Sequence, residues 1–298
     1  MRKIRIPVIV KAVNSEFWQA LLSGAKKAEE DLTDVIISTY GPKEETEIKE
    51  QVEILKKVIS EKPDAIVIAS TSNDLTVPFV EKAMSSGIPV ITIDNRINTD
   101  QISAFLATDN KKAAASAADK LAALLNNAGN EKKSVVVINS LKDSKVDQDR
   151  DEGFLTRIKE LIADLEVLET INVENDLALT EKKVSELIAA TKGCLCVFAD
   201  NDQTGIGAAR AIHKMKSKDR VYAFAFDSAA EEISAVEKGD LKGIVVQNPF
   251  KMGYEGVKIA KDAVLGRQIE ENVDTGAEIV TKDNMKEPSI QELLYPCR

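Results

Sequence analysis

Short runs of apolar, often β-branched residues alternate along this chain with longer segments whose apolar residues recur every three or four positions. A short apolar run is typical of a buried strand, and the longer spacing is typical of an amphipathic helix. The clearest helical spacings are Phe17, Leu21, Ala25 and Ala28; Val52, Leu55, Val58 and Ile59; and Ala117, Leu121, Leu124 and Leu125. Strands are expected at 4–10, 35–40, 65–69, 90–93, 103–107, 134–139, 166–171, 195–199, 221–226, 243–247 and 277–281.

Helix-breaking residues fall between these elements. Gly87, Gly239 and Gly266 each end a helical segment, and Pro63 follows another. Strands that alternate with helices predict βαβ units and a parallel sheet, so the fold class is α/β. Because these strands are too many for one ordinary doubly wound sheet, we expect two Rossmann-like lobes. The extended segment 103–109 is the best candidate for the first passage between them.

Composition narrows the classes of partner. The chain has 298 residues, of which 44% are hydrophobic and 30% charged, and its net charge is −9. Such an acidic surface repels phosphate backbones, so we expect no nucleic-acid partner. No apolar run approaches the roughly 18 residues of a membrane span. The five apolar residues at 6–10 are too few for the core of a signal peptide and predict a strand instead.

Cysteine and histidine are scarce. Cys194 and Cys196 lie two apart in an expected strand, which favours a core position for both, and three cysteines provide no even disulfide framework. The only histidine, His213, stands beside Lys214 at a helix end and is expected at the surface. We therefore expect no metal site.

Polar residues gather where the strands end. In open α/β sheets, ligands bind outside the carboxyl ends of the strands. Asp, Asn and Ser at such positions also cap helices, and for each residue taken singly this alternative stays open. Capping does not account for Phe17 and Trp18, whose adjacent side chains point in different directions, so that one can enter the core while the other faces the crevice. The candidate ligand-binding residues are Ser15, Phe17, Trp18, Asp94, Asn95, Arg150, Asn201, Asp227 and Gln247.

These residue types indicate the chemistry of the ligand. Carboxylates accept hydrogen bonds from hydroxyls, Asn and Gln side chains both donate and accept, and Arg donates in a planar fork. Aromatic faces cover the apolar face of a ring. Such a set suits a small, neutral, hydroxyl-rich molecule such as a sugar. It does not suit phosphates, which require Lys, Arg and glycine loops.

Motifs of the common cofactor-dependent enzymes are missing. A dinucleotide site needs G-x-G-x-x-G just after the first strand, where residues 13–17 contain no glycine. The pair Gly205 and Gly207 lies inside an expected helix without a third glycine, and the chain has no P-loop and no G-x-S-x-G elbow. We expect no cofactor. Acid–base work by Asp94, Asp200 and Asp227 stays open, because the three carboxylates could converge.

The strand-end residues together resemble one family. The chain is similar over about residues 4–282 to the periplasmic sugar-binding proteins of the ribose/galactose type, which are solute receptors of bacterial ABC importers; the lac-repressor effector domain shares this fold. The motifs that carry the resemblance are Asn14-Ser15-Glu16-Phe17-Trp18, Gly87-Ile88-Pro89-Val90-Ile91-Thr92-Ile93-Asp94, Ala107-Thr108-Asp109-Asn110, Arg150-Asp151-Glu152-Gly153-Phe154, Val197-Phe198-Ala199-Asp200-Asn201-Asp202, Ala225-Phe226-Asp227 and Val246-Gln247-Asn248-Pro249.

The resemblance implies an architecture and a site. It implies a type 1 periplasmic binding protein, with two lobes joined by a three-segment hinge and a ligand cleft between them. The first lobe would hold 1–107 plus 248–276, and the second 108–247 plus 277–298. In ribose-type members, the residues matching Phe17 and Trp18 cover the sugar ring. Those matching Asp94, Arg150, Asn201, Asp227 and Gln247 bind its hydroxyls.

Two departures from the ribose-type pattern bear on the ligand. Asn95 follows Asp94 where ribose-type members carry Arg, and Ser15 and Trp18 stand where Asn and Phe are usual. These changes argue against ribose itself. They leave open another pentose, a hexose, a polyol or a furanose-like signal molecule.

We therefore expect a non-enzymatic, monomeric sugar receptor that closes around its ligand and is recognised by the membrane subunits of an ABC transporter. The resemblance implies an extracytoplasmic location, either periplasmic or lipid-anchored as a lipoprotein at the cell surface, with the signal segment absent from this chain. One alternative is a sugar-sensing module of a lac-repressor-like regulator, or the input domain of a chemoreceptor or kinase. Another is a carboxylate-using hydrolase or isomerase acting on a sugar.

Overall fold

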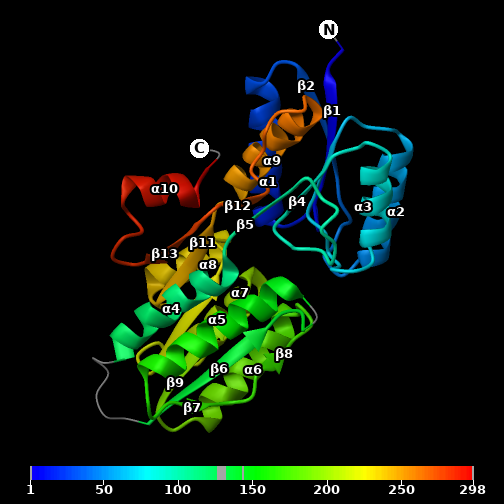
Figure 1. Ribbon diagram of the computed structural model, residues 1–298. Coiled ribbons are helices and arrows are strands. Elements are labelled where there is room, and N and C mark those ends of the chain that lie inside the picture. Colours follow the sequence, from blue (N-terminus) through cyan, green and yellow to red (C-terminus); the bar gives the residue numbers. More distant parts are fainter. Residues whose placement is uncertain (1, 126–131, 143, 297–298) are drawn as a thin grey trace.

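A computed structural model describes residues 2–125, 132–142 and 144–296, and it contains two β-sheets with helices on both faces of each (Figure 1). The first sheet has the strand order β12-β5-β4-β3-β1-β2, and its pairings are parallel. Its strands are β1 (Ile4–Ile9), β2 (Val35–Tyr40), β3 (Ile66–Ile68), β4 (Val90–Ile93), β5 (Ala104–Ala107) and β12 (Asn272–Asp274).

Four helices cover the first sheet. Because successive strand residues face opposite ways, Ile6 and Val8 of β1 pack on one face, and Ile9 packs on the other. The first face holds α1 (Glu16–Asp31) and α9 (Pro249–Val264). The second holds α2 (Ile48–Ser60) and α3 (Val77–Ser85). The strands are thus buried on both sides, which is why they read as nearly continuous apolar runs.

The second sheet has the order β13-β11-β10-β9-β6-β7, with β8 also paired to β6. All its pairings are parallel except that of β13 with β11. Its strands are β6 (Lys133–Asn139), β7 (Glu166–Val167), β8 (Ile171–Asn172), β9 (Cys194–Ala199), β10 (Val221–Phe226), β11 (Gly243–Gln247) and β13 (Ala277–Thr281). One face packs on α4 (Asn110–Leu125) and α5 (Lys145–Leu161), and the other on α6 (Leu177–Ala190), α7 (Asp202–Lys214), α8 (Ala230–Lys238) and α10 (Pro288–Leu294).

The chain passes between the sheets three times, from β5 to α4, from β11 to α9 and from β12 to β13. Two of these segments lie side by side. The Thr108 hydroxyl donates to the Gly276 carbonyl at 3.3 Å, and the Asp109 amide donates to Asp274 Oδ1 at 3.3 Å. The expected α/β fold with two lobes and three connecting segments is therefore confirmed. The exact division into lobes, 1–107 plus 248–276 and 108–247 plus 277–298, stays a prediction.

Two details of the sheets differ from expectation. The run 166–171, predicted as one strand, forms two short strands that meet β6 at separate places: Val167 pairs with Val135, and Ile171 pairs with Ile138. Strand β12 was not expected. Its residues Asn-Val-Asp show no apolar run, and it is a three-residue edge strand that depends on pairing with β5.

Cys194, Cys196 and the histidine lie where the sequence predicted them. Cys194 and Cys196 are buried in the core of the second sheet. His213 lies near the end of α7 with its side chain 72% exposed, and Nδ1 is 3.0 Å from Asp240 Oδ2. Both placements agree with the sequence. Within the described ranges, no helix has the combination of length and apolar character needed to cross a bilayer.

Helices α1 and α9 approach each other so closely that glycine is required at their contact. A Cβ on Gly253 would overlap the Leu21 carbonyl oxygen, and a Cβ on Gly24 would overlap that of Phe250. Backbone atoms cannot move aside as a flexible side chain would, so the two helices would have to separate. This contact joins the N-terminal part of the chain to a segment more than two hundred residues later.

We predict that Gly253→Ala lowers the free energy of unfolding by about 1–3 kcal/mol, because overpacking of this contact outweighs the helix propensity of alanine. Gly256→Ala, one turn further along α9, is the matched control: its Cβ would meet only side-chain atoms of Val67 and Ile93, at 3.3 and 3.5 Å. Urea denaturation measures both. Equal effects of the two substitutions would contradict the proposed role of the helix contact.

Candidate functional site

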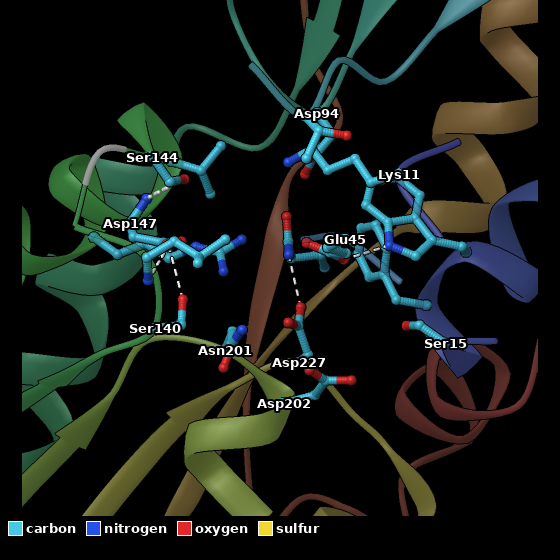
Figure 2. Close-up of a pocket in the computed structure, with 17 residues that line it drawn as sticks. Lys11, Ser15, Glu45, Asp94, Ser140, Ser144, Asp147, Asn201, Asp202 and Asp227 are labelled. Atoms are coloured by element: carbon cyan, nitrogen blue, oxygen red, sulfur yellow. Dashed lines mark hydrogen bonds and ion pairs between the residues drawn. The ribbon is translucent and has the colours of Figure 1, made fainter. Parts of the chain in front are cut away.

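A cavity lies between the two sheets, where strand ends of both lobes face each other (Figure 2). The first lobe contributes Lys11, Ser15, Phe17, Trp18, Glu45, Thr71 and Asp94. The second contributes Ser140, Leu141, Ser144, Val146, Asp147, Arg150, Asn201, Asp202, Asp227 and Gln247. Parallel strands bring their carboxyl ends to one edge of a sheet. Two sheets that face each other at those edges therefore collect side chains from distant parts of the chain.

Eight of the nine predicted residues line this cavity; the exception is Asn95. Asn95 is 2% exposed, and its amide nitrogen donates to the Ser70 carbonyl at 3.0 Å and to Asn73 Oδ1 at 2.8 Å. The prediction that Asn95 faces the ligand is therefore corrected. Consecutive residues at a strand end point in different directions, and the direction toward the cavity is taken by Asp94. Ligand contact by the other eight stays a prediction.

Lys11 and Asp94 form a buried ion pair in the wall of the first lobe. Nζ of Lys11 lies 2.6 Å from Asp94 Oδ2, with the two side chains 9% and 5% exposed. Burial alone would lower the pKa of Lys11, but the carboxylates of Asp94 and Glu45 outweigh it and the pKa is raised. Lys11 is therefore a cation at neutral pH. Its ammonium reaches the cavity from the residues that follow β1 (Figure 2).

The only tryptophan of the chain is fixed in the same wall. Trp18 is 2% exposed, and its indole N–H donates to Glu45 Oε1 at 2.6 Å. Phe17 meets it edge to face with ring centroids 4.8 Å apart, and the Lys11 ammonium lies 5.5 Å from the Trp18 ring. A buried indole N–H needs an acceptor, and Glu45 supplies one from the loop before α2. The orientation of the ring is thereby set without any ligand.

Arg150 is fixed by hydrogen bonds in the wall of the second lobe. Its Nε donates to Asn110 Oδ1 at 2.8 Å, and its Nη1 donates to the Asp200 carbonyl at 2.7 Å. The guanidinium carbon lies 4.0 Å from the Phe226 ring. The hydrogen bonds found among the described residues leave Nη2 unused, so this nitrogen remains able to donate to a ligand.

Asn201 both caps a helix and lines the cavity. Its Oδ1 accepts from the Thr204 amide at 3.0 Å at the start of α7, so the capping alternative is confirmed for this residue. Its amide nitrogen donates to Asn175 Oδ1 at 2.8 Å. Ser15 also stands at an N-cap position, before α1, but makes no side-chain capping bond. Its hydroxyl is not consumed by the helix.

Asp94 and Asp227 occupy equivalent places in the two lobes. Each follows directly on the third strand of its sheet order, β4 or β10, and adopts left-handed backbone angles, with φ of 64° and 80°. The Asp94 amide donates to Leu106 of the next strand at 2.8 Å, and the Asp227 amide donates to Val245 at 2.9 Å. Such φ values are uncommon outside glycine and recur at functional sites.

Gln247 donates a hydrogen bond to Asp227, and its own amide oxygen is left as an acceptor. Its Nε2 donates to Asp227 Oδ1 at 2.7 Å, while its buried Oε1 has no hydrogen-bond partner among the described residues. Gln247 is 2% exposed. A buried polar atom without a partner costs stability, and a donor group of a ligand would remove that cost.

Four charged residues of the cavity were missed by the sequence analysis: Lys11, Glu45, Asp147 and Asp202. Asp147 carried a usable signal, because residues three apart on a helix share a face and Arg150 was already a candidate. Burial raises the pKa of Asp147 despite the nearby Arg150. The pKa of Asp202 is raised to about 7, mainly by burial and further by the charges of Asp227 and Glu45. Glu45 lies in a loop and had no such signal.

The fold and this cavity define a class: two-lobed α/β proteins that enclose a small polar solute between their lobes. A family model described as a periplasmic binding protein domain matches residues 6–268, and the chain belongs to this family. This match and the relatives described next together confirm the resemblance to ribose-type sugar-binding proteins.

Similar proteins extend the comparison. The chain is 25% identical to the ribose import binding protein of Escherichia coli, over 95% of this chain and 92% of that protein. A carbohydrate transporter solute binding protein of Agrobacterium radiobacter in complex with D-arabinose is 34% identical, with a TM-score of 0.93 and 99% of each chain covered. An ABC transporter solute binding protein of Agrobacterium vitis with bound D-fucose is 32% identical, with a TM-score of 0.90 and coverage of 98% and 100%. These names are those of transport proteins and give no support to the regulator alternative.

The raised pKa of Asp202 predicts a pH dependence of stability. The fold disfavours its ionised form, so its stabilising contribution is complete below the usual value of 3.8 and is lost as the pH rises through about 7. Asp202→Asn should therefore unfold with wild-type free energy near pH 4 and be about 1–3 kcal/mol more stable than wild type at pH 8.

Chemical denaturation at both pH values measures the effect. Asp100→Asn, at an exposed carboxyl, is the matched control and should show no pH-dependent difference from wild type. The same stability change at pH 4 and at pH 8 would count against ionisation of Asp202 as its cause.

Proposed function

We propose that this protein is the extracytoplasmic receptor of an ABC importer, which binds a monosaccharide-like sugar or polyol between its lobes and presents it to the membrane subunits. The observation that carries the proposal is the cavity itself. Aromatic rings, carboxylates, an arginine and amides from both lobes line one enclosed space, in a member of a family whose similar structures hold D-arabinose and D-fucose.

The proposed roles follow from the surroundings of each side chain. Phe17 and Trp18 cover the apolar face of the sugar ring. Asp94 and Asp227 accept from hydroxyls on opposite sides of the cavity, while Arg150 donates through Nη2. Asn201, Gln247 and Ser15 complete the polar wall. Each directional bond discriminates between stereoisomers, because a buried carboxylate or amide without its partner costs about 1–3 kcal/mol.

Ligand capture would proceed by closure of the lobes about the three connecting segments. The Ala230 amide of α8 donates to Glu16 Oε2 of α1 at 3.0 Å. This hydrogen bond joins the two lobes, and neither residue belongs to a connecting segment. This contact is available only when the lobes are together. One chain supplies both walls of the cavity, so a monomer suffices, and the closed form is what the transporter would recognise.

The proposal includes no catalysis. The relatives and similar structures reported above are binding proteins of transport systems. We expect a bound sugar to be recovered unchanged. Carbon NMR of a bound, labelled sugar over several hours checks this point, and the appearance of an isomer or hydrolysis product would contradict it.

Free sugars and polyols, including D-arabinose, D-fucose and D-tagatose, should be titrated while the fluorescence of Trp18 and the melting temperature are followed. We expect at least one to change both signals, because ring stacking alters the indole environment and ligand binding stabilises the folded state. Absence of any response across the panel would contradict the proposal.

Arg150→Ala should weaken the responding sugar at least 100-fold, because it removes a charge-assisted donor and leaves acceptors of the site unpaired. Arg157→Ala on the same helix is the matched control. Arg157 has a side chain that is 40% exposed and pairs with Asp119 and Glu160, so its loss should leave sugar affinity unchanged. Circular dichroism establishes that both variants fold. Unweakened binding by folded Arg150→Ala would refute the site assignment.

A further inference from the structure

The cavity carries more carboxyl groups than cations. From the first lobe, Glu45 and Asp94 face it together with Lys11. From the second, Asp147, Asp202 and Asp227 face it together with Arg150. Five carboxyl groups thus stand against two cationic side chains in a space largely shielded from water. A site built only to hydrogen-bond neutral hydroxyls has no electrostatic need for this excess.

Ion pairing within the protein does not remove the excess. Among the described residues, the only ion pair within 4.0 Å made by these groups is that of Lys11 with Asp94. Arg150 directs Nε and Nη1 to the neutral oxygens of Asn110 and the Asp200 carbonyl. No cation of the residues described by the structure therefore lies at contact distance from Glu45, Asp147, Asp202 or Asp227.

The remaining partners of these carboxyl groups are neutral donors. Glu45 accepts from the Trp18 indole, Asp147 from the Ser140 hydroxyl, and Asp227 from the Gln247 amide. Each of these oxygens can accept further bonds. Gln247 is 2% exposed and lines the same cavity, and its Oε1 accepts from no donor in the part of the chain that the structure describes. The wall of the cavity is thus rich in hydrogen-bond acceptors.

One ammonium already demonstrates how the site holds such a group. Lys11 Nζ lies 2.6 Å from Asp94 Oδ2 and 5.5 Å from the centroid of the Trp18 ring, so a carboxylate and an aromatic face share one cation. On the opposite side, Asp202 and Asp227 lie close together without such a partner (Figure 2). A ligand cation placed there would supply these two carboxyl groups with the partner that Lys11 supplies to Asp94.

The pKa values of these carboxyl groups are raised in the cavity. Burial raises the pKa of Asp147, Asp227 and Glu45, and it raises that of Asp202 to about 7 with a further contribution from Asp227. At a pH near 7 Asp202 is therefore partly protonated. A cationic ligand beside it would favour the ionised carboxylate and release that proton.

We propose that the ligand of this site carries a protonated amino group, and that the site prefers an amino sugar to the neutral sugar of the same stereochemistry. This inference rests on the proposed sugar-binding function and narrows its substrate class. An ammonium brings three donors and one positive charge to a wall of acceptors. A neutral hydroxyl brings one donor and no charge. The N-acetyl derivative keeps a nitrogen on the same ring carbon but carries no positive charge.

Isothermal titration calorimetry at pH 6 should compare D-glucosamine, D-galactosamine and D-mannosamine with their parent sugars and with their N-acetyl forms. At this pH an amine with a pKa near about 7.7–8.0 is protonated. We expect at least one amino sugar to bind about 10-fold or more tightly than its parent, and its N-acetyl form to bind more weakly than either.

Proton release provides a second readout. Affinity for the amino sugar should rise between pH 5 and pH 6.5, because protonated carboxyl groups must ionise to receive the ammonium. Titrations in buffers of different ionisation enthalpy should show protons leaving the complex on binding. An affinity that stays constant or falls over this range, with no protons released, would overturn the inference.

Three substitutions test the charges directly. Asp202→Asn and Glu45→Gln each remove one negative charge with little change of shape, and each should reduce the ratio of amino-sugar to parent-sugar affinity by about 10-fold. Lys11→Met removes the resident cation and should raise that ratio. Asp100→Asn, at an exposed carboxyl outside the cavity, should leave it unchanged.

The outcomes separate this inference from the proposed function. Tight binding of a neutral sugar, with its amino counterpart equal or weaker, overturns the amino-sugar preference and leaves the sugar receptor standing. A preference that survives both Asp202→Asn and Glu45→Gln unchanged also overturns it. Absence of binding by every neutral and amino sugar overturns both proposals.

Discussion

The convergence of strand ends is the constraint on which the rest of this structure depends. A parallel sheet collects the ends of its strands at one edge, and the three connecting segments hold two such edges face to face. Residues as distant as Lys11 and Gln247 therefore line one cavity. The connecting segments also bond to one another, through Thr108 and Gly276 and through Asp109 and Asp274, so the lobes share a common support.

Within that frame, burial decides how the charged groups behave. The carboxylates of Asp94 and Glu45 raise the pKa of Lys11 at low exposure, while Asp202 and Asp227 face the same space with no cation of the described residues at contact distance. Removing charge from water is expensive unless a partner compensates for it. A ligand group that supplied such a partner would lower this cost, and the gain would add to the free energy of binding.

The sequence was sufficient where a residue's position followed from local pattern. Apolar runs located the buried strands, and residues within two positions of the strand ends, such as Asp94, Asn201 and Asp227, lie at the cavity as expected. Prediction failed where position depends on partners far along the chain. Strand β12 exists because β5 pairs with it, and Glu45 reaches the cavity from a loop of no regular pattern. The side chains of Asp94 and Asn95 point in different directions, and residue type does not reveal which of the two faces the cavity.

The left-handed backbone shared by Asp94 and Asp227 has a consequence for re-engineering the protein. Glycine, asparagine and aspartate tolerate φ values of 64° and 80°, whereas bulky or β-branched residues do not. A library that randomises the cavity wall at these two positions would lose most members to backbone strain before ligand choice was tested. Biosensor design is better directed at Ser15, Thr71 and Ser144, which line the same space without positive φ.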